Sequence, residues 1–341
     1  MLKWEIKKLF KNKSIIVSSI VLILLCGIMS LLKPDLETEN SYIDEKGNYI
    51  SDTRSEYTIT NEKLNYKVSE SKEIKLQKNL KKQDELSKKA SEMASLKLNH
   101  DSGKEYKDVN FYKVLNYRLS SMLSSIVIIG IVIYIFSNIY TDEKLSNVDS
   151  IILSSKNKSK ALFSKLSLSI IVPAVFYLIY VLIIGCITMV QYGQPVNGAL
   201  QAYRIVDIVT LVNPISINEY TVQSILTMMT IFISTGIFAS LFSFITKNSV
   251  ESIVGITVFL VIGKILTLMK FLPAKLISVI NYSNYIDIIM HPDMIIGNYM
   301  GNISLFGQSL GLISLAYIVL VATLLIGIGL NIYVFRKVLT K

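Results

Sequence analysis

The chain has 341 residues, of which 51% are apolar, with a mean hydropathy of +0.48 and a formal net charge of +10. A composition this hydrophobic excludes an ordinary soluble domain and indicates a membrane protein. The basic balance does not indicate nucleic-acid binding. The long polar segment 33–113 holds as many acidic as basic residues, so the excess lies around the apolar runs.

Six apolar runs are long enough to cross about 30 Å of hydrocarbon, which takes roughly 20 residues in a helix. They cover residues 14–32, 116–140, 162–190, 221–246, 249–269 and 307–335. Backbone polar groups inside a bilayer have to be satisfied within the spanning segment, as they are in a helix. The sequence therefore predicts an all-α polytopic membrane protein with six transmembrane helices.

The positions of the lysines predict how the chain is oriented. In a six-span chain the N-terminus, the connection after the second span and the C-terminal tail fall on one side, and basic residues gather in all three. The positive-inside bias makes that side cytoplasmic. We expect a multi-pass protein of the plasma membrane with both termini inside and residues 33–113 outside.

The first 13 residues have the pattern of an amphipathic helix. Leu2, Ile6, Leu9 and Phe10 share one face, lysines occupy the flanks, and Trp4 suits the headgroup level. We expect an interfacial helix that guides a partner. The alternative is a plain positive flank of the first span.

Residues 33–113 form a long insertion between the first two spans. Its first part is polar and rich in turn residues, with short strands expected at 42–43 and 49–50. From 61 to 98 the sequence is almost free of glycine and proline and carries acid-before-base pairs at i,i+4 spacing, which favour helix. We predict an extracellular helix, long or broken, over about 61–98. It either binds a ligand or is solvated without one.

Hydroxyl side chains recur in two of the predicted spans. They are Ser120, Ser121, Ser124 and Ser125 in the second, and Thr227, Thr230 and Ser234 in the fourth. Such residues either let helices pack closely and bond to one another, or line a translocation path for a polar or amphiphilic substrate. In the third span, Pro173 predicts a kink, because proline removes a backbone hydrogen bond.

The fifth span and the segment after it contain two further irregularities. Lys264, near the outer end of the span, either serves a function or extends its ammonium group to the membrane surface. Residues 270–305 are too apolar for an ordinary loop and too often interrupted by proline and glycine for a span. We expect an external re-entrant or interfacial element there.

Motifs for catalysis and nucleotide binding are missing from the sequence. It has no Gly-x-x-x-x-Gly-Lys-[Ser/Thr] phosphate loop and no His-Glu-x-x-His zinc motif. No acidic residue lies at depth in a span, where an ion-coupled carrier usually needs one. We predict that the chain is not an enzyme, holds no cofactor or metal, and depends on a partner for energy.

The connection after the second span relates this chain to a known family. It reads Asp142-Glu143-Lys-Leu-Ser-Asn-Val-Asp-Ser-Ile-Ile-Leu-Ser-Ser-Lys156 and continues to Lys165-Leu166. This run resembles the first cytoplasmic connection of type-2 ABC exporter permeases of Gram-positive bacteria. Asn147 stands where that family often has glycine, and Lys156 where many members have proline. The resemblance extends to the plan of an amphipathic N-terminal helix, six spans and an external insertion.

In that family the connection is a coupling helix that docks on a separate ATPase subunit. The resemblance implies such a helix over 141–161, with an apolar face between charges that orient docking. The residues implied in ATPase coupling are Glu143, Leu145, Val148, Asp149, Ile151, Ile152 and Lys156. The alternative is a membrane-surface helix whose lysines meet anionic lipid.

The resemblance also implies a function and partners. The chain would be the permease subunit of an ATP-driven exporter, paired with a second permease chain, identical or not, and with ABC-type ATPase subunits that bind ATP and magnesium. The expected cargo is an amphiphilic peptide, an antimicrobial or a drug. Small drugs or ions form the competing substrate class. A membrane sensor or scaffold that signals through the extracellular helix without transport is the alternative function.

Overall fold

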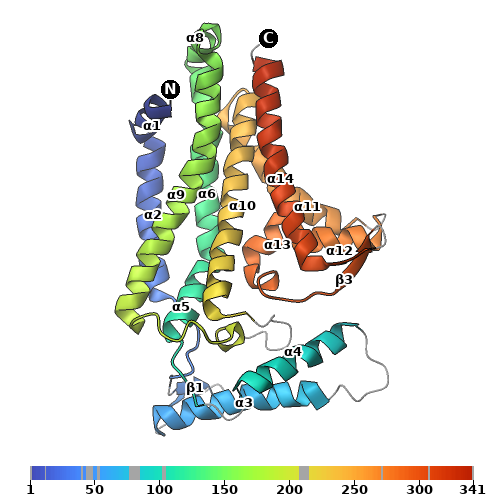
Figure 1. Cartoon of the computed structure of the whole chain (residues 1–341). Helices are drawn as coiled ribbons and strands as arrows, with labels where there is room; N and C mark the ends of the chain where they lie inside the picture. The colour runs from blue at the N-terminus through green and yellow to red at the C-terminus, as the bar shows by residue number, and fades with distance from the viewer. Residues whose placement is uncertain are drawn as a thin grey trace.

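The structure is a computed structural model, and it describes the chain in ten ranges. These are residues 2–11, 13–39, 41–43, 49–51, 54–76, 85–101, 105–206, 215–269, 272–305 and 308–339. Within them, six helices are long and apolar enough to cross a membrane (Figure 1). The chain is an all-α polytopic membrane protein, as its apolar runs predict.

The spanning helices surround one central helix. They are α2 (Lys13–Leu31), α6 (Met122–Ser137), α9 (Lys158–Tyr192), α10 (Ile217–Ile245), α11 (Ser249–Thr267) and α14 (Leu312–Val334). Of the apolar stretch of α10, 67% is buried, against 17% for α11. Because α10 packs against α6, α9, α11 and α14, it forms the core of the bundle (Figure 1).

The boundaries of α10 and α11 follow from polar caps. Ser216 and Glu219 form a capping box at the start of α10, in which each side chain bonds to the backbone of the other. At the start of α11, Asn248 Oδ1 accepts a hydrogen bond from the backbone N–H of Glu251 at 2.9 Å. This cap explains how the chain reverses in so few residues between the two helices.

The predicted second span, 116–140, is not a single helix. Helix α5 (Asn110–Leu119) ends before Ser120 and Ser121, and α6 begins at Met122. Ser121 has extended backbone angles, φ −65° and ψ 133°, which interrupt the helix. Serine side chains compete for backbone hydrogen bonds and favour helix ends, so two consecutive serines can end a helix inside an apolar run.

The predicted sixth span, 307–335, begins too early. Residues 308–311 form strand β4 (Gln308–Gly311), which pairs antiparallel with β3 (Asn302–Leu305). Helix α14 then starts at Leu312 and ends in a π-helical turn, Phe335–Leu339. Strand β4 is only four residues long and runs directly into α14, so no loop sequence marks where the helix begins.

The two chain ends lie at the same end of the bundle, together with the α8 segment (Figure 1). We call it the termini end and the opposite one the insertion end. The termini end comprises α1 (Leu2–Lys11), α7 (Thr141–Leu145) and α8 (Val148–Ser154). Helix α1 exposes Trp4 and Phe10 but buries Glu5. Its apolar residues are thus free to meet lipid while one carboxylate points into the protein.

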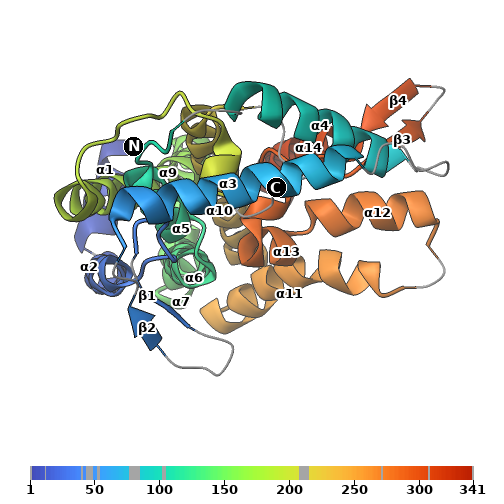
Figure 2. The same ribbon diagram turned by 90° about the horizontal axis from the view of Figure 1, so that it is seen from below.

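Residues 33–113 fold at the insertion end. Strands β1 (Ser41–Ile43) and β2 (Tyr49–Ser51) pair antiparallel, which confirms the two predicted strands. The helix predicted over 61–98 is two helices, α3 (Glu56–Leu76) and α4 (Glu85–Asp101), and its part 77–84 lies outside the described residues. Figure 2 shows α3 and α4 lying side by side across this end of the bundle.

Two cation–ring contacts connect the α3–α4 hairpin and its C-terminal flank to the chain between α9 and α10. Lys97 of α4 is only 4% exposed, and its Nζ lies 5.2 Å from the centre of the Tyr203 ring. The guanidinium of Arg204 lies 5.7 Å from the Tyr106 ring. Tyr203 and Arg204 belong to a short 3-10 helix, Ala202–Arg204. Buried cations thus lie at the contact between the hairpin and the bundle.

Residues 272–305 form a broken element beside α11. It consists of α12 (Ala274–Ser283), α13 (Tyr285–Met290), a 3-10 turn (Pro292–Met294) and strand β3. Lys264 of α11 donates to both carboxylate oxygens of Asp287 in α13, at 2.7 and 2.9 Å. Lys264 therefore has an ion-pair partner within the chain. Neither of the two interpretations of Lys264 from the sequence included such a partner.

Helix α9 remains helical through Pro173, and α10 passes close to it there. Proline has no N–H, so the carbonyl of Ser169 receives no helical hydrogen bond from it. A Cβ atom on Gly236 of α10 would lie 2.6 Å from that carbonyl oxygen and 2.8 Å from Pro173 Cγ. Only glycine fits at this crossing without a shift of the backbone.

Candidate functional site

The α7–α8 segment replaces the single helix predicted over 141–161. The two helices are separated at Asn147, which has left-handed backbone angles, φ 53° and ψ 20°. Asparagine is one of the few residues besides glycine that adopt this conformation readily. The chain therefore turns at Asn147, and α8 leaves α7 in a new direction.

Helix α7 is fixed to the end of the central helix α10. The backbone N–H of Thr141 donates to Ser243 Oγ at 3.2 Å. Lys144 Nζ donates to the carbonyls of Phe244 at 2.7 Å and Thr246 at 2.6 Å. A lysine at this position satisfies terminal carbonyls and complements the negative end of the helix dipole. The base of the α7–α8 segment is therefore held by the core of the bundle.

A buried ionic cluster around Lys165 ties the same base to α1 and α9. Lys165 of α9 is fully buried, and its Nζ lies 2.7 Å from Glu143 Oε1 and 3.0 Å from Glu5 Oε2. It also donates to the Ile139 carbonyl at 3.2 Å. Lys8 forms a further ion pair with Glu143. Charges removed from water need such close partners to offset the cost of desolvation. We call these groups the Lys165 cluster.

Three apolar side chains around the bend between α7 and α8 are exposed. Leu145, Val148 and Ile151 are 65%, 37% and 68% exposed. On the inward side, Leu153 packs against the core of the bundle. Val148 and Ile151, at i and i+3, lie on adjacent turns of one face of α8, and Leu145 is the last residue of α7, just before the bend at Asn147. The α8 tip, Leu145, Val148 and Ile151, is therefore an exposed hydrophobic surface on a fixed base.

The structure divides the seven residues that the resemblance implies in coupling. Three form the α8 tip, Asp149 and Ile152 are half-buried, and Lys156 is exposed. Glu143 is 2% exposed and lies in the Lys165 cluster instead of on the surface. Glu143 is therefore placed to position the segment, whereas the tip is placed to make contact.

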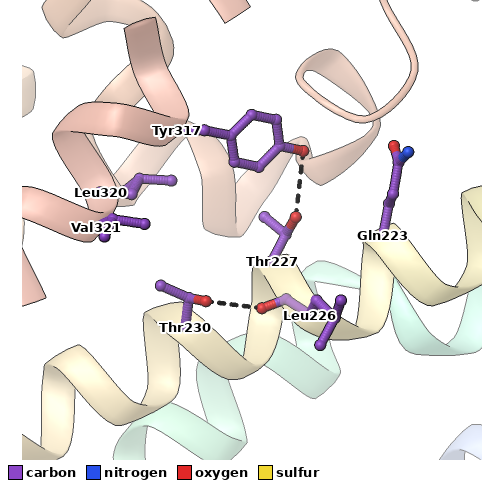
Figure 3. A pocket seen from close by; sticks show the side chains of 7 residues that line it. All are labelled: Gln223, Leu226, Thr227, Thr230, Tyr317, Leu320 and Val321. Carbon is purple, nitrogen blue, oxygen red and sulfur yellow. Dashed lines mark hydrogen bonds between the residues drawn. The ribbon is translucent and has the colours of Figure 1, made fainter. Parts of the chain in front are cut away.

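A groove of about 300 Å³ lies between α10 and α14 (Figure 3). Thr227 Oγ1 and the Tyr317 hydroxyl are 3.2 Å apart across it, and Thr230 Oγ1 donates to the Leu226 carbonyl within its own helix. Apart from Gln223, apolar side chains form the rest of its walls. The lining residues are Gln223, Leu226, Thr227, Thr230, Tyr317, Leu320 and Val321. A few polar groups among apolar ones suit an amphiphilic ligand.

The other residues proposed for a translocation path lie outside this groove. Ser120 Oγ is 3.2 Å from Ser224 Oγ of α10, where it links two helices. Ser124 and Ser125 are buried and donate to the Ser121 carbonyl at 2.8 and 3.1 Å. Ser234 is buried in α10. Of the residues proposed for the path, Thr227 and Thr230 line this groove, and Ser120 lies at a contact between two helices.

Two groups of the site were not found from the sequence. Lys165 and Glu5 lie 160 positions apart, so no local pattern relates them. The sequence shows Lys165 just inside a predicted span and Glu5 on the first helix. Neither position by itself indicates an ion pair. Tyr317 places a phenol hydroxyl in the apolar sixth span, and a buried hydroxyl of this kind usually has a hydrogen-bond partner. That requirement could have indicated a contact with a hydroxyl group of the fourth span.

Fold and site together define a polytopic helical membrane protein with a fixed, apolar-tipped segment at one end of the bundle. Comparisons with known protein families, with curated proteins and with solved structures find no match for this chain. Its function is therefore argued from its own residues and from the resemblance described above.

Proposed function

We propose that the chain is the permease subunit of an ATP-driven exporter of the type-2 ABC class, embedded in the plasma membrane with both termini in the cytoplasm. In this proposal the α8 tip docks on a partner ATPase and transmits its movement to the bundle. A second permease chain completes the transporter. The chain itself supplies the path for the substrate and no ATP hydrolysis.

The observation that carries the proposal is the α8 tip on its fixed base. Exposed apolar side chains on a segment that faces solvent favour binding of a protein partner. The hydrogen bonds to α10 and the Lys165 cluster connect that segment to α1, α9 and α10. A partner that moved the tip would therefore act on three helices at once.

The backbone at Asn147 adds support for the family resemblance. Its left-handed conformation is one that glycine adopts without cost and asparagine tolerates. The resembling permeases often have glycine at this place, so both residue types satisfy the same turn. The substitution of asparagine for glycine is thus physically conservative at this position.

Basic residues support the proposed orientation. Lys156, Lys160, Arg336 and Lys337 belong to the termini end of the bundle. The positive-inside bias favours a cytoplasmic position for such an end, and the α3–α4 hairpin would then lie outside. An ATPase partner would be found on the same side as the α8 tip.

The groove between α10 and α14 supports an amphiphilic cargo. Its hydroxyl groups, Thr227, Thr230 and Tyr317, lie among leucine and valine side chains. A peptide, antimicrobial or drug with both apolar and polar parts matches that lining better than a small ion does.

Purification of the tagged chain from its native membranes, followed by identification of co-purifying proteins, tests the proposal. We expect a P-loop ATPase in stoichiometric amount, and ATP hydrolysis by the reconstituted complex. Ile151→Asp should abolish co-purification, because it places a charge at the centre of the apolar contact. The chain should still insert into the membrane.

A matched control is Val250→Asp. Val250 is 70% exposed, and it lies in the first turn of α11, where an aspartate favours the helix. We expect normal ATPase binding in this variant. Binding that survives Ile151→Asp would remove the coupling role of α8. Absence of any ATPase from the unmodified chain would favour the sensor or scaffold instead.

A further inference from the structure

A pocket of about 220 Å³ lies between the fifth spanning helix and the broken element beside it. Helices α11, α12 and α13 and the turn after α13 contribute its walls (Figure 1). It shares no residue with the groove between α10 and α14 or with the α7–α8 segment. Its volume is below the roughly 300–1,000 Å³ of pockets for drug-sized molecules, so it suits a ligand the size of a single small ring.

The lysine and the aspartate of the pocket neutralise each other. Lys264 Nζ donates to Asp287 Oδ1 and Oδ2 at 2.7 and 2.9 Å, and Asn284 Nδ2 donates to the same Oδ2 at 2.8 Å. The pair is within reach of a ligand, because its two side chains are 42% and 27% exposed. A cationic ligand would approach the charge of Lys264 and an anionic one that of Asp287, so either would meet a like charge. The ion pair therefore favours a neutral, polar ligand.

Three further polar side chains line the pocket, those of Asn281, Tyr282 and His291. None of the three has a hydrogen-bond partner in the part of the chain that the structure describes. Asn281 and His291 are exposed and Tyr282 is half-buried, and none of their polar atoms is shut off from solvent. An amide, a phenol and an imidazole each offer both a donor and an acceptor. The pocket thus presents three accessible groups that are ready to bond to a ligand.

The base of the pocket is apolar. Ile288 and Ile295 line it and are 1% and 2% exposed, while Met294, 43% exposed, stands at its edge. A sugar ring carries hydroxyl groups around its rim, each of them a donor and an acceptor, and C–H groups on its faces. Such a ring can bond to the three polar side chains while one face packs on the isoleucines. It carries no charge that would disturb the ion pair.

The pocket lies where a spanning helix leaves the hydrocarbon. Lys264 belongs to the last turn of α11, and lysines at this depth lie at the level of the lipid headgroups. A ligand can reach such a place from water or as the headgroup of a membrane lipid.

We propose that this pocket binds a neutral sugar ring, with its hydroxyl groups on Asn281, Tyr282 and His291 and one C–H face on Ile288 and Ile295. The chemistry is shared by a free monosaccharide and by the sugar headgroup of a glycolipid. The inference does not rest on the proposed transport function, because binding is measured on this chain without an ATPase.

Two measurements on the full chain in lipid nanodiscs distinguish the sources, after purification in a detergent without a sugar headgroup. Nuclear magnetic resonance titration with the methyl glycosides of glucose, galactose and N-acetylglucosamine tests the free sugar. Tetrahydropyran-2-methanol, a similar ring with a single hydroxyl, should bind at least about tenfold more weakly than the best of these, because it lacks most of the hydrogen bonds.

Photo-crosslinking from an azidophenylalanine at position 294 tests the lipid. We expect crosslinking to monoglucosyl diacylglycerol to exceed that to diacylglycerol or phosphatidylglycerol at least about tenfold. Binding of a methyl glycoside without selective crosslinking would assign the pocket to a free sugar. Failure of both measurements would overturn the proposal, and so would tighter binding of glucuronate or glucosamine than of the neutral sugars.

Variants of the polar side chains test the assignment of the residues. Asn281→Ala and Tyr282→Phe should each weaken binding about threefold to tenfold, since each removes one hydrogen-bonding group. Both should fold, because neither group bonds to the described part of the protein. Tyr333→Phe, at an exposed tyrosine near the other end of α14, is the matched control and should bind like the native chain. Native binding in a folded double variant, Asn281→Ala with Tyr282→Phe, would refute the proposal.

Discussion

Lys165 Nζ of α9 lies 2.7 Å from Glu143 Oε1 of α7, with both side chains almost completely buried. Glu5 of α1 completes the contact from a third helix. Carboxylates and an ammonium group in such a place depend on one another, because none of them can turn to water. The termini end of the bundle therefore folds as one unit.

We expect Lys165→Met to lower the free energy of unfolding by about 3–5 kcal/mol, because it leaves Glu5 without its cation and takes one of two from Glu143. Thermal unfolding in a fixed detergent measures the loss. Lys160→Met, at an exposed position on the same helix, should be within about 0.5 kcal/mol of the native chain. Adding Glu5→Gln and Glu143→Gln to Lys165→Met should restore most of the stability. Equal stability of the two lysine variants would show that the cluster contributes nothing.

Arg118 is the corresponding buried cation at the insertion end. Its guanidinium donates to the carbonyls of Ser30 at 2.8 Å and Leu32 at 3.0 Å, and to Thr188 and Gln191 of α9 at 2.9 and 2.7 Å. We expect Arg118→Lys to destabilise the chain by about 2 kcal/mol or more, since one ammonium group cannot reproduce the planar fork. Unfolding by heat, followed by circular dichroism, is a suitable measurement. A lysine variant as stable as the native chain would contradict this role.

Gly236→Ala tests the crossing of α9 and α10. The added Cβ would meet backbone, the Ser169 carbonyl, at 2.6 Å, so the two helices would have to separate. We expect a loss of about 1–3 kcal/mol in stability. Gly130→Ala is the control, since a Cβ there meets nothing within 4 Å, and it should stabilise α6 by about 0.5–1 kcal/mol. If both variants changed the stability by the same amount, the close approach of α9 and α10 would not explain why position 236 is glycine.

The buried Lys97 predicts that the stability of the α3–α4 hairpin depends on pH. Burial lowers the pKa of Lys97 from 10.5 to about 8. Below pH 8 both the folded and the unfolded forms are protonated. Between 8 and 10.5 only the unfolded form keeps the proton, so the free energy of unfolding should rise with pH across this range. The full change is about 3 kcal/mol.

Urea titration of the full chain at several pH values measures this effect, with a fluorophore attached through Lys88→Cys, an exposed position of α4, in a chain whose exposed Cys186 is replaced by alanine. In Lys97→Met the same titration should give a more stable hairpin at pH 7, with little change up to pH 9.5. A native hairpin that weakened as the pH rose above 8 would show the opposite sign and contradict the burial of a charged Lys97.

Much of this fold follows from hydrophobicity alone. Runs of about 20 apolar residues located all six spans, and the strands at 41–43 and 49–51 lie within one residue of the bounds predicted from the turn-rich sequence around them. The break at Ser120–Ser121 did not, because apolar residues continue on both sides of it. Local sequence predicts which segments are buried, whereas helix ends depend on single side-chain bonds.

The site was predictable only where its residues are neighbours in sequence. The sequence predicted an apolar face of Leu145, Val148, Ile151 and Ile152, and all of these but the half-buried Ile152 are exposed. The location of Glu143 in a buried cluster depends on Glu5 and Lys165, which reach it from other helices. Contacts between distant segments are decided by tertiary packing, and a single sequence carries little information about them.

Helix α9 has a buried cation contact near each of its ends. Lys165 belongs to the cluster at the termini end, and Thr188 and Gln191 bond to Arg118 at the insertion end. Between these contacts the helix lacks one backbone hydrogen bond, at Pro173, so its bending stiffness is lowest there. With both ends held, a force applied at α8 would be converted into a change of angle at Pro173. The neighbour that such a hinge would displace first is Gly236, in the central helix of the bundle.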